Sequence, residues 1–143
     1  MFLAQLAQCM PMMGNVVLVV MMHFRHLFFT AKKEPGNIDV AEVHDAFSIC
    51  EIIEVEDLGF AKKGKGNEFV RTLYDTQDRR INPRGGLIGS GHPLGATGIA
   101  QIVEIGQQLQ GIAGKRQVPQ AKVGLVQNMS AAATSSSVLI LQR

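Results

Sequence analysis

One histidine, His92, stands in a glycine-rich segment that runs from residue 85 to residue 98. Pro93 follows it directly, and six glycines surround it: Gly85, Gly86, Gly89, Gly91, Gly95 and Gly98. Glycine allows positive φ angles and a close approach of the backbone to a ligand, while proline stiffens the turn that carries the histidine. This composition is typical of a reactive loop. A plain surface connection is also rich in glycine, so composition alone leaves both interpretations open.

A second histidine, His44, comes where a predicted strand meets a predicted helix, in the run His44-Asp45-Ala46-Phe47. Backbone N–H groups and the positive end of a helix dipole gather at such a junction. The structural alternative is that Asp45 caps the helix and His44 is a satisfied residue at the strand end. Since open α/β sheets bind ligands at the carboxyl ends of their strands, His44 and His92 can converge on one pocket.

Nucleotide-binding loops do not fit the glycine-rich segment. A phosphate loop needs a lysine and a hydroxyl residue after its last glycine, but Gly91 is followed by His92 and Pro93. A dinucleotide fingerprint needs a third glycine that the segment from Gly89 to Leu94 lacks. Neither type of nucleotide site is therefore expected.

The cysteines and the other two histidines do not form a metal site by their spacing. Cys9 and Cys50 have no regular spacing, which fits a reducing compartment better than a disulfide framework. His23 and His26 are three residues apart, but no further ligand stands at a recognisable distance from them. We expect no metal, and a cytoplasmic location.

The chain has the composition of one apolar globular domain: 143 residues, 46% hydrophobic, 18% charged, with a net charge of +2. Its basic residues are scattered apart from a short run at 62–65, which we interpret as a solvated loop, so no nucleic-acid partner is expected. The apolar run from Val16 to Met22 is far shorter than the ~20 residues of a membrane span. It favours a buried strand over residues 15–22, with a membrane anchor as the alternative.

The elements around His44 follow from hydrophobic spacing. Residues 38–44 alternate between apolar and polar types, which predicts a half-buried strand. A helix follows, ended by Gly59, and its apolar face is expected to consist of Ala46, Ile49, Cys50 and Ile53. The glycines and charges from Gly64 to Arg80 indicate an exposed flap.

A second helix is predicted from about residue 94 to residue 110, directly after His92, and Gly111 ends it. Its apolar stripe consists of Ile99, Ile102, Val103, Gly106 and Leu109. Short buried strands are predicted at 123–126 and 138–141, with a run of small residues between them. Strands and helices in this order predict an α/β fold built on a layered sheet.

The stretches 38–47, 57–60, 82–87 and 89–98 resemble, in the same order, the C-terminal half of a thiolase. The Gly91-His92-Pro93 run within its glycine frame is the most specific part. The version that begins with His44 is similar to the sterol-carrier-type and archaeal-type thiolases, since other members begin this motif with asparagine. The resemblance implies a thiolase-like C-terminal domain over residues 31–143, with a mixed sheet layered with helices, after an atypical apolar segment at 1–30.

The resemblance also implies roles for individual residues. His92 would be the general base and an oxyanion donor, and His44 would hold a catalytic water or make the second oxyanion contact. The substrate-binding residues would be Gly86, Gly89, Gly91, Pro93 and Asn128. The implied reaction is a Claisen condensation or thiolytic cleavage in lipid metabolism, with an acyl-coenzyme A thioester as substrate and no separate cofactor.

Both cysteines of the family's chemistry are missing from their expected places. The nucleophile lies in the family's N-terminal half, and neither Cys9 nor Cys50 matches its motif. The second cysteine is replaced by Asn128 and its neighbours in one version of the motif and by Ala46 in the other. We expect a truncated chain that is inactive alone and works with a thiolase N-terminal half or as an oligomer. The alternative is a non-catalytic domain that binds coenzyme A, lipid or protein.

A lone half of a thiolase is also expected to expose an apolar face, because thiolases pack their two halves through central helices. The predicted face consists of Ile99, Ile102 and Leu109, unless oligomerisation covers it.

Overall fold

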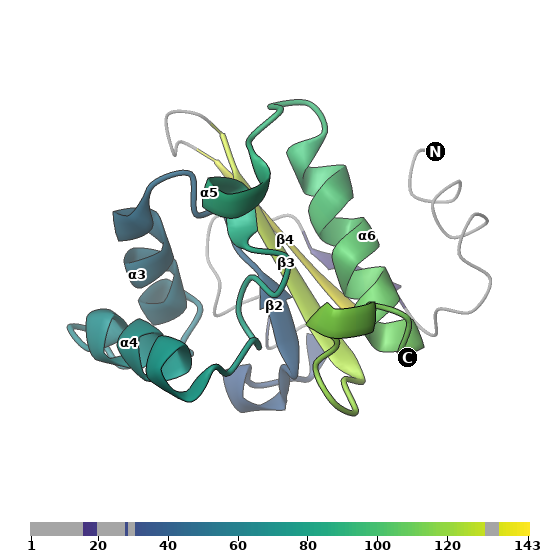
Figure 1. Cartoon of the computed structure of the whole chain (residues 1–143), viewed down its shortest axis with the longest axis horizontal. Coiled ribbons are helices and arrows are strands. Elements are labelled where there is room, and N and C mark those ends of the chain that lie inside the picture. The colour runs from purple at the N-terminus through teal and green to yellow at the C-terminus, as the bar shows by residue number, and fades with distance from the viewer. Residues whose placement is uncertain (1–15, 20–27, 29–30, 131–134) are drawn as a thin grey trace.

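A computed structural model describes residues 16–19, 28, 31–130 and 135–143 of the chain. A four-stranded sheet lies between helix α6 on one face and helices α3 and α4 on the other (Figure 1). The strands, in the spatial order β1-β4-β3-β2, are β1 (Val16–Val19), β2 (Val40–Glu42), β3 (Val123–Met129) and β4 (Ser136–Gln142). Strand β2 runs parallel to β3, and β4 runs antiparallel to both of its neighbours. The predicted mixed sheet layered with helices is confirmed.

Three of the strands agree with the sequence-based predictions, although their limits differ. Strands β3 and β4 include the predicted segments 123–126 and 138–141 and extend beyond them. Strand β1 occupies the middle of the predicted strand at 15–22, whose remaining positions lie outside the described residues. None of the helices in the described part of the chain has the length and apolar composition of a membrane span.

Strand β2 is buried on both of its faces, so the prediction of a half-buried strand at 38–44 is wrong. Val40 packs with Ile105 on the α6 side, while Val43, just beyond the strand, packs with Val55 on the opposite side. Glu42 lies between them and is fully buried. The alternating pattern misleads because one of its polar positions is a buried carboxylate.

Helix α3 (Ser48–Asp57) has the opposite orientation to the predicted one. Ile49 and Ile53 are exposed, at 57% and 49%, whereas Glu54 and Val55 are buried. The predicted apolar face is therefore wrong. The end of the helix is as predicted, because Gly59 has a φ of +81° and a side chain at this position would overlap with Pro35.

The segment predicted as an exposed flap contains helix α4 (Gly66–Thr76). The helix packs Phe69, Val70 and Leu73 against the core of α3 and the sheet. Its first residue, Gly66, donates its backbone N–H to the Glu56 carboxylate over 2.7 Å. The i, i+1, i+4 spacing of the three apolar residues was the signal for this helix, and the surrounding charges and glycines hid it.

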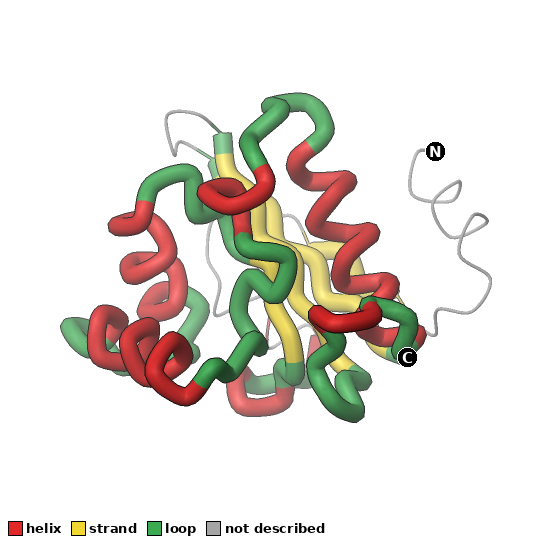
Figure 2. Tube along the Cα trace, viewed as in Figure 1, coloured by secondary structure: helices red, strands yellow, loops and turns green. Residues whose placement is uncertain are grey.

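Two helices follow, the short α5 (Gly86–Ser90) inside the glycine-rich segment and α6 (Thr97–Gln110) after it (Figure 2). Gly111 ends α6 with a φ of +77°, as predicted. The apolar stripe is only partly as expected: Ile99 and Val103 are exposed and Ile102 is half-buried, but Leu109 is buried in the chain's own core. Leu109 is therefore not part of an exposed face. Single 3-10 turns occur at Pro35–Asn37 and Gly114–Arg116.

Helix α6 lies unusually close to the sheet because β3 has a glycine at the crossing. A side chain at Gly124 would overlap with Ile105 of the helix. This crossing fixes the position of α6 relative to the sheet, and His92 precedes the first residue of α6 by five positions.

Candidate functional site

His44 and His92 are in contact at the end of the sheet. Their ring centroids are 4.8 Å apart and their planes meet at 89°, an edge-to-face arrangement. His44 follows β2, and His92 lies between α5 and α6. The structure thus brings together the two histidines that the sequence placed in separate strand-to-helix junctions.

Thr97 contacts one ring nitrogen of His92. Its Nδ1 lies 2.7 Å from the Thr97 hydroxyl, and the same hydroxyl lies 3.1 Å from the Pro93 carbonyl. When this hydroxyl donates to the carbonyl, Nδ1 is the donor toward Thr97 and Nε2 keeps a free lone pair. A neutral histidine in this form can accept a proton at Nε2.

His44 is buried, with 5% of its surface exposed, and neither ring nitrogen has a hydrogen-bond partner among the described residues. Burial lowers the pKa of His44 from its usual value, and the nearby His92 lowers it further. The ring is therefore neutral near pH 7. A buried polar atom without a partner costs stability, so these nitrogens are suited to an oxygen atom that the described residues do not supply.

Asp45 fixes the short helix α5 to the end of β2. Its carboxylate accepts the backbone N–H of Leu87 over 2.6 Å, and a side chain at Gly86 would overlap with this carboxylate. Gly86 also has a φ of +62°, which favours glycine. The alternative that Asp45 caps α3 is wrong, because the N-cap of α3 is Phe47 and has no side-chain hydrogen bond.

The residues predicted to bind substrate lie in different environments. Gly86 is buried against Asp45, whereas Gly89, Gly91 and Pro93 are exposed. Asn128 is half-buried at the end of β3, where a side chain at Gly98 would come within 2.9 Å of its amide nitrogen. Gly86 has a clear structural reason to be glycine. The role of all five in binding stays a prediction.

An apolar groove of about 460 Å³ lies at the start of α6, and neither histidine lines it. It runs between the start of α6 and the facing ends of β3 and β4, and its first lining residue, Leu94, is two positions after His92. Its main apolar walls are Leu94, Ile99, Ile102, Val126, Val138 and Leu139. The part of the predicted apolar face that is exposed therefore adjoins the candidate site.

Buried carboxyl groups near the histidines are a feature that sequence reasoning missed. Burial raises the pKa of Glu42 to about 7, although a backbone hydrogen bond from Arg84 opposes this shift. Burial, and to a lesser extent the charge of Asp45, raises the pKa of Glu54 to about 9. A glutamate inside an otherwise apolar strand was the only available signal, and it points to Glu42 alone.

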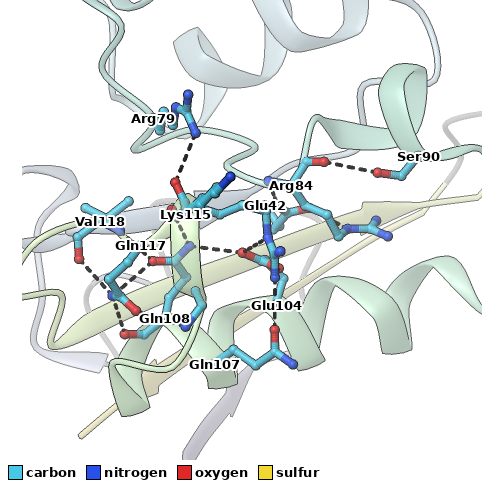
Figure 3. A network of polar contacts seen from close by, with 12 residues as sticks. Glu42, Arg79, Arg84, Ser90, Glu104, Gln107, Gln108, Lys115, Gln117 and Val118 are labelled. Carbon is cyan, nitrogen blue, oxygen red and sulfur yellow. Dashed lines mark hydrogen bonds and ion pairs between the residues drawn. The ribbon is translucent and has the colours of Figure 1, made fainter.

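Glu42 belongs to a polar network that connects β2, α6 and the segment before α5 (Figure 3). The Arg84 N–H donates to the Glu42 carboxylate over 3.3 Å, and the Arg84 carbonyl accepts the Ser90 hydroxyl over 3.2 Å. On α6, Glu104 pairs with Arg116 over 2.9 Å. Through Arg84 these contacts connect both ends of the α5 segment to β2.

Neither a metal site nor a cysteine nucleophile is evident in this region. The described residues contain no cluster of three histidine, cysteine or acidic side chains that could hold a metal ion. Cys50 is a free, half-exposed residue in the first turn of α3. Cys9, His23 and His26 lie outside the described residues.

Comparisons with known proteins agree with this architecture. Residues 24–143 match the family model described as thiolase C-terminal domain-like. Over 124 residues the chain is 48% identical to acetyl-CoA acetyltransferase of Methanothermobacter thermautotrophicus, a match that covers 83% of this chain and 32% of that protein. Over 101 residues it is 52% identical to human sterol carrier protein 2, which covers 66% of this chain and 18% of that protein. The chain thus spans a third or less of the length of these relatives.

Two solved structures share the fold. An Ltp2-ChsH2(DUF35) aldolase superposes with a TM-score of 0.68 at 22% identity, covering 84% of this chain and 31% of that chain. The peroxisomal 3-ketoacyl-CoA thiolase of Saccharomyces cerevisiae, built from two core domains of identical topology, superposes with a TM-score of 0.56 at 19% identity. That match covers 92% of this chain and 34% of that chain. The domain boundary at residue 30 stays a prediction.

Proposed function

Because the chain belongs to the thiolase C-terminal domain-like family, we propose that it supplies the base of an acyl-transfer site that acts on acyl-coenzyme A thioesters. His92 is the proposed base, and His44 is the proposed holder of a water molecule or of the thioester oxygen. The observation that carries the proposal is the contact between the two rings, combined with the hydrogen bond that leaves Nε2 of His92 free.

The proposed chemistry begins with a cysteine thiol that gives its proton to Nε2 of His92. The resulting thiolate sulfur bonds to the thioester carbonyl carbon, and the coenzyme A thiolate leaves and takes the proton back from His92. Negative charge develops on the thioester oxygen, where an N–H donor from either ring stabilises it. Since His44 is already neutral, the positive charge that forms on His92 has no charged histidine beside it.

The nucleophilic thiol comes from outside the site described above, either from a segment beyond these 143 residues or from a second polypeptide. Its carrier must reach the surface around His92. The exposed Leu94 and the adjoining apolar groove offer a contact area there.

The experiment is a reconstitution with a thiolase N-terminal half. The complex is isolated by gel filtration, and thiolytic cleavage of acetoacetyl-CoA is then measured on that complex. We expect activity with the unaltered chain and a loss of at least ~100-fold with His92→Ala, because a positioned general base contributes about that much. The control is Tyr74→Ala on α4, which alters an exposed side chain away from the histidines. An isolated complex without activity, or one unaffected by His92→Ala, would contradict the proposal.

A second candidate is a non-catalytic domain that binds coenzyme A, lipid or protein. It is favoured by the absence of a cysteine at Ala46 and at the Asn128 loop, the two places of the family's second cysteine, and by the apolar groove that begins at Leu94. Calorimetry with an acyl-CoA separates the ligand-binding version from the others. Heat of binding that disappears on Leu94→Asp, without any thiolysis in the reconstituted complex, would support it. Acyl-CoA as ligand, the oligomeric state and a cytoplasmic location all stay predictions.

A further inference from the structure

Two fully buried glutamines connect the elements that carry the histidines. Gln127 lies at the end of β3 with 1% of its surface exposed, and Gln101 lies on α6 with none exposed. Neither belongs to the motifs that point to the site. Gln127 is hydrogen-bonded directly to His44, and Gln101 is hydrogen-bonded to Gln127.

Gln127 holds the backbone of His44. Its side-chain oxygen accepts the His44 N–H over 2.9 Å, and its amide nitrogen donates to the Ser136 hydroxyl over 3.0 Å. The Ser136 hydroxyl in turn donates to the carbonyl of Asn128. The side chain thus connects the end of β2 to the start of β4, across β3, at the point where His44 leaves the sheet.

Gln101 connects this group to the helix that positions His92. Its amide nitrogen donates to the backbone carbonyl of Gln127 over 3.1 Å. Thr97 is four residues earlier on the same face of α6 and contacts Nδ1 of His92. One helix face therefore supports both rings, His92 through Thr97 and His44 through Gln101 and Gln127.

We propose that Gln127 and Gln101 are positioning residues that set the placement of His44 against His92. The inference rests on the proposed function, because the placement of the two rings matters for catalysis only if both act on one substrate. The geometry of the two rings is measurable without any activity.

Packing alone gives no reason for amides at these positions. A buried amide costs stability unless it is hydrogen-bonded, and a leucine or methionine would fill a similar volume without this cost. At Gln101 the cost is only partly offset, because its side-chain oxygen has no partner among the described residues. Buried polar groups whose hydrogen bonds are incomplete cluster at functional sites.

The test is NMR spectroscopy of the whole 143-residue chain with ¹⁵N-labelled histidine. In the unaltered chain we expect a nuclear Overhauser effect between the two rings and the tautomer of His92 that is protonated at Nδ1. Gln127→Met should weaken the ring-to-ring signal at least twofold, and Gln101→Met should weaken it in the same direction. Ser136→Ala is a milder variant that loosens Gln127 without removing it, and it keeps the test open if Gln127→Met does not fold.

Gln108→Met is the matched control. Gln108 is an equally buried glutamine on α6, but its partners are Glu104, Arg116 and Val118, far along the helix from Thr97. A purely structural role predicts that all three glutamine variants lower stability alike and leave the histidine signals unchanged, and that result would overturn the proposal. An inactive reconstituted complex combined with altered histidine signals would reject the proposed function and leave the positioning role supported.

Discussion

Helices α6 and α3 lie on opposite faces of the sheet, and each of them buries a glutamate. On α6, Glu104 is 2% exposed and pairs with Arg116, which donates from Nε to both carboxylate oxygens over 3.1 Å. On α3, Glu54 is 4% exposed, and neither of its oxygens has a hydrogen-bond partner among the described residues. The two glutamates are buried to a similar extent, but only Glu104 is paired with an arginine.

The difference separates a structural carboxylate from a protonated one. Glu104 is in contact with an arginine and ties α6 to the turn at Gly114–Arg116. Glu54 avoids the cost of a buried charge by holding a proton, since its pKa is raised to about 9. Asp45 is a third case, in which a buried carboxylate accepts a backbone N–H from α5.

Glu54→Gln is expected to have the largest effect. The pKa of Glu54 is raised from its ordinary value of 4.5 to about 9 in the folded state, so folding favours the protonated form. The contribution of this group to the free energy of unfolding therefore falls as the pH rises from about 4.5 toward 9. A neutral amide removes this dependence. The variant should be more stable than the unaltered chain by about 5 kcal/mol at pH 8 and equal to it near pH 4.

Urea denaturation at the two pH values measures this gain. Glu68→Gln on α4 is the control, because Glu68 is an exposed residue whose ion pair with Lys65 contributes little. A gain that is the same at both pH values would show that folding does not raise the pKa of Glu54.

Arg116→Met should have the opposite sign, because it leaves the Glu104 carboxylate buried without its counter-ion. Removal of one partner from a buried pair costs ~3–5 kcal/mol, and the partial exposure of Arg116 reduces the expected loss to about 2–3 kcal/mol. The measurement is the free energy of unfolding at pH 7. Lys115→Met makes the same change at the neighbouring exposed residue and should be close to neutral. Equal losses in both variants would remove the distinction between the two helices.

Gly86→Ala should disturb the third carboxylate, Asp45. The new side chain would occupy the place of this carboxylate at a φ of +62°, so we expect a loss of about 2 kcal/mol and release of α5. Gly89→Ala is the matched control, since no atom lies within 4 Å of its added side chain. Hydrogen exchange of the Leu87 amide reports the release directly. Protection of this amide in Gly86→Ala equal to that in Gly89→Ala would contradict the role of Asp45.

The sequence predicts the site more accurately than it predicts the burial around it. The glycines, proline and spacing near His92 are local signals, and they point to both histidines. His44 follows strand β2 as predicted, whereas His92 lies between helices α5 and α6, so the strand-to-helix junction predicted for it is wrong. The orientation of α3 is not a local property. Its isoleucines alternate with glutamates at helical spacing, and the position of Val55 and Leu58 against Val43 decides which set turns inward.

The same limit explains the missed elements of the site. Gln127 is distant in sequence from both motifs, and Gln101 lies just beyond the glycine-rich segment; only the packing of α6 on β3 connects the two glutamines. Leu109 belongs to the same apolar stripe as Ile99, yet it is buried because the sheet extends beneath the second half of α6. Periodicity identifies the apolar positions of a helix, but it does not show how many of them the sheet covers.

The most direct test of the account is the reactivity of the nucleophilic thiol in the reconstituted complex. Iodoacetamide alkylates the thiolate form, and peptide-resolved mass spectrometry follows the nucleophile with Cys50 as an internal reference. If His92 is the base, His92→Ala should slow alkylation of the nucleophile at pH 7 by about tenfold or more and leave the rate at Cys50 unchanged. An unchanged rate at the nucleophile would contradict the assignment of His92 as the base.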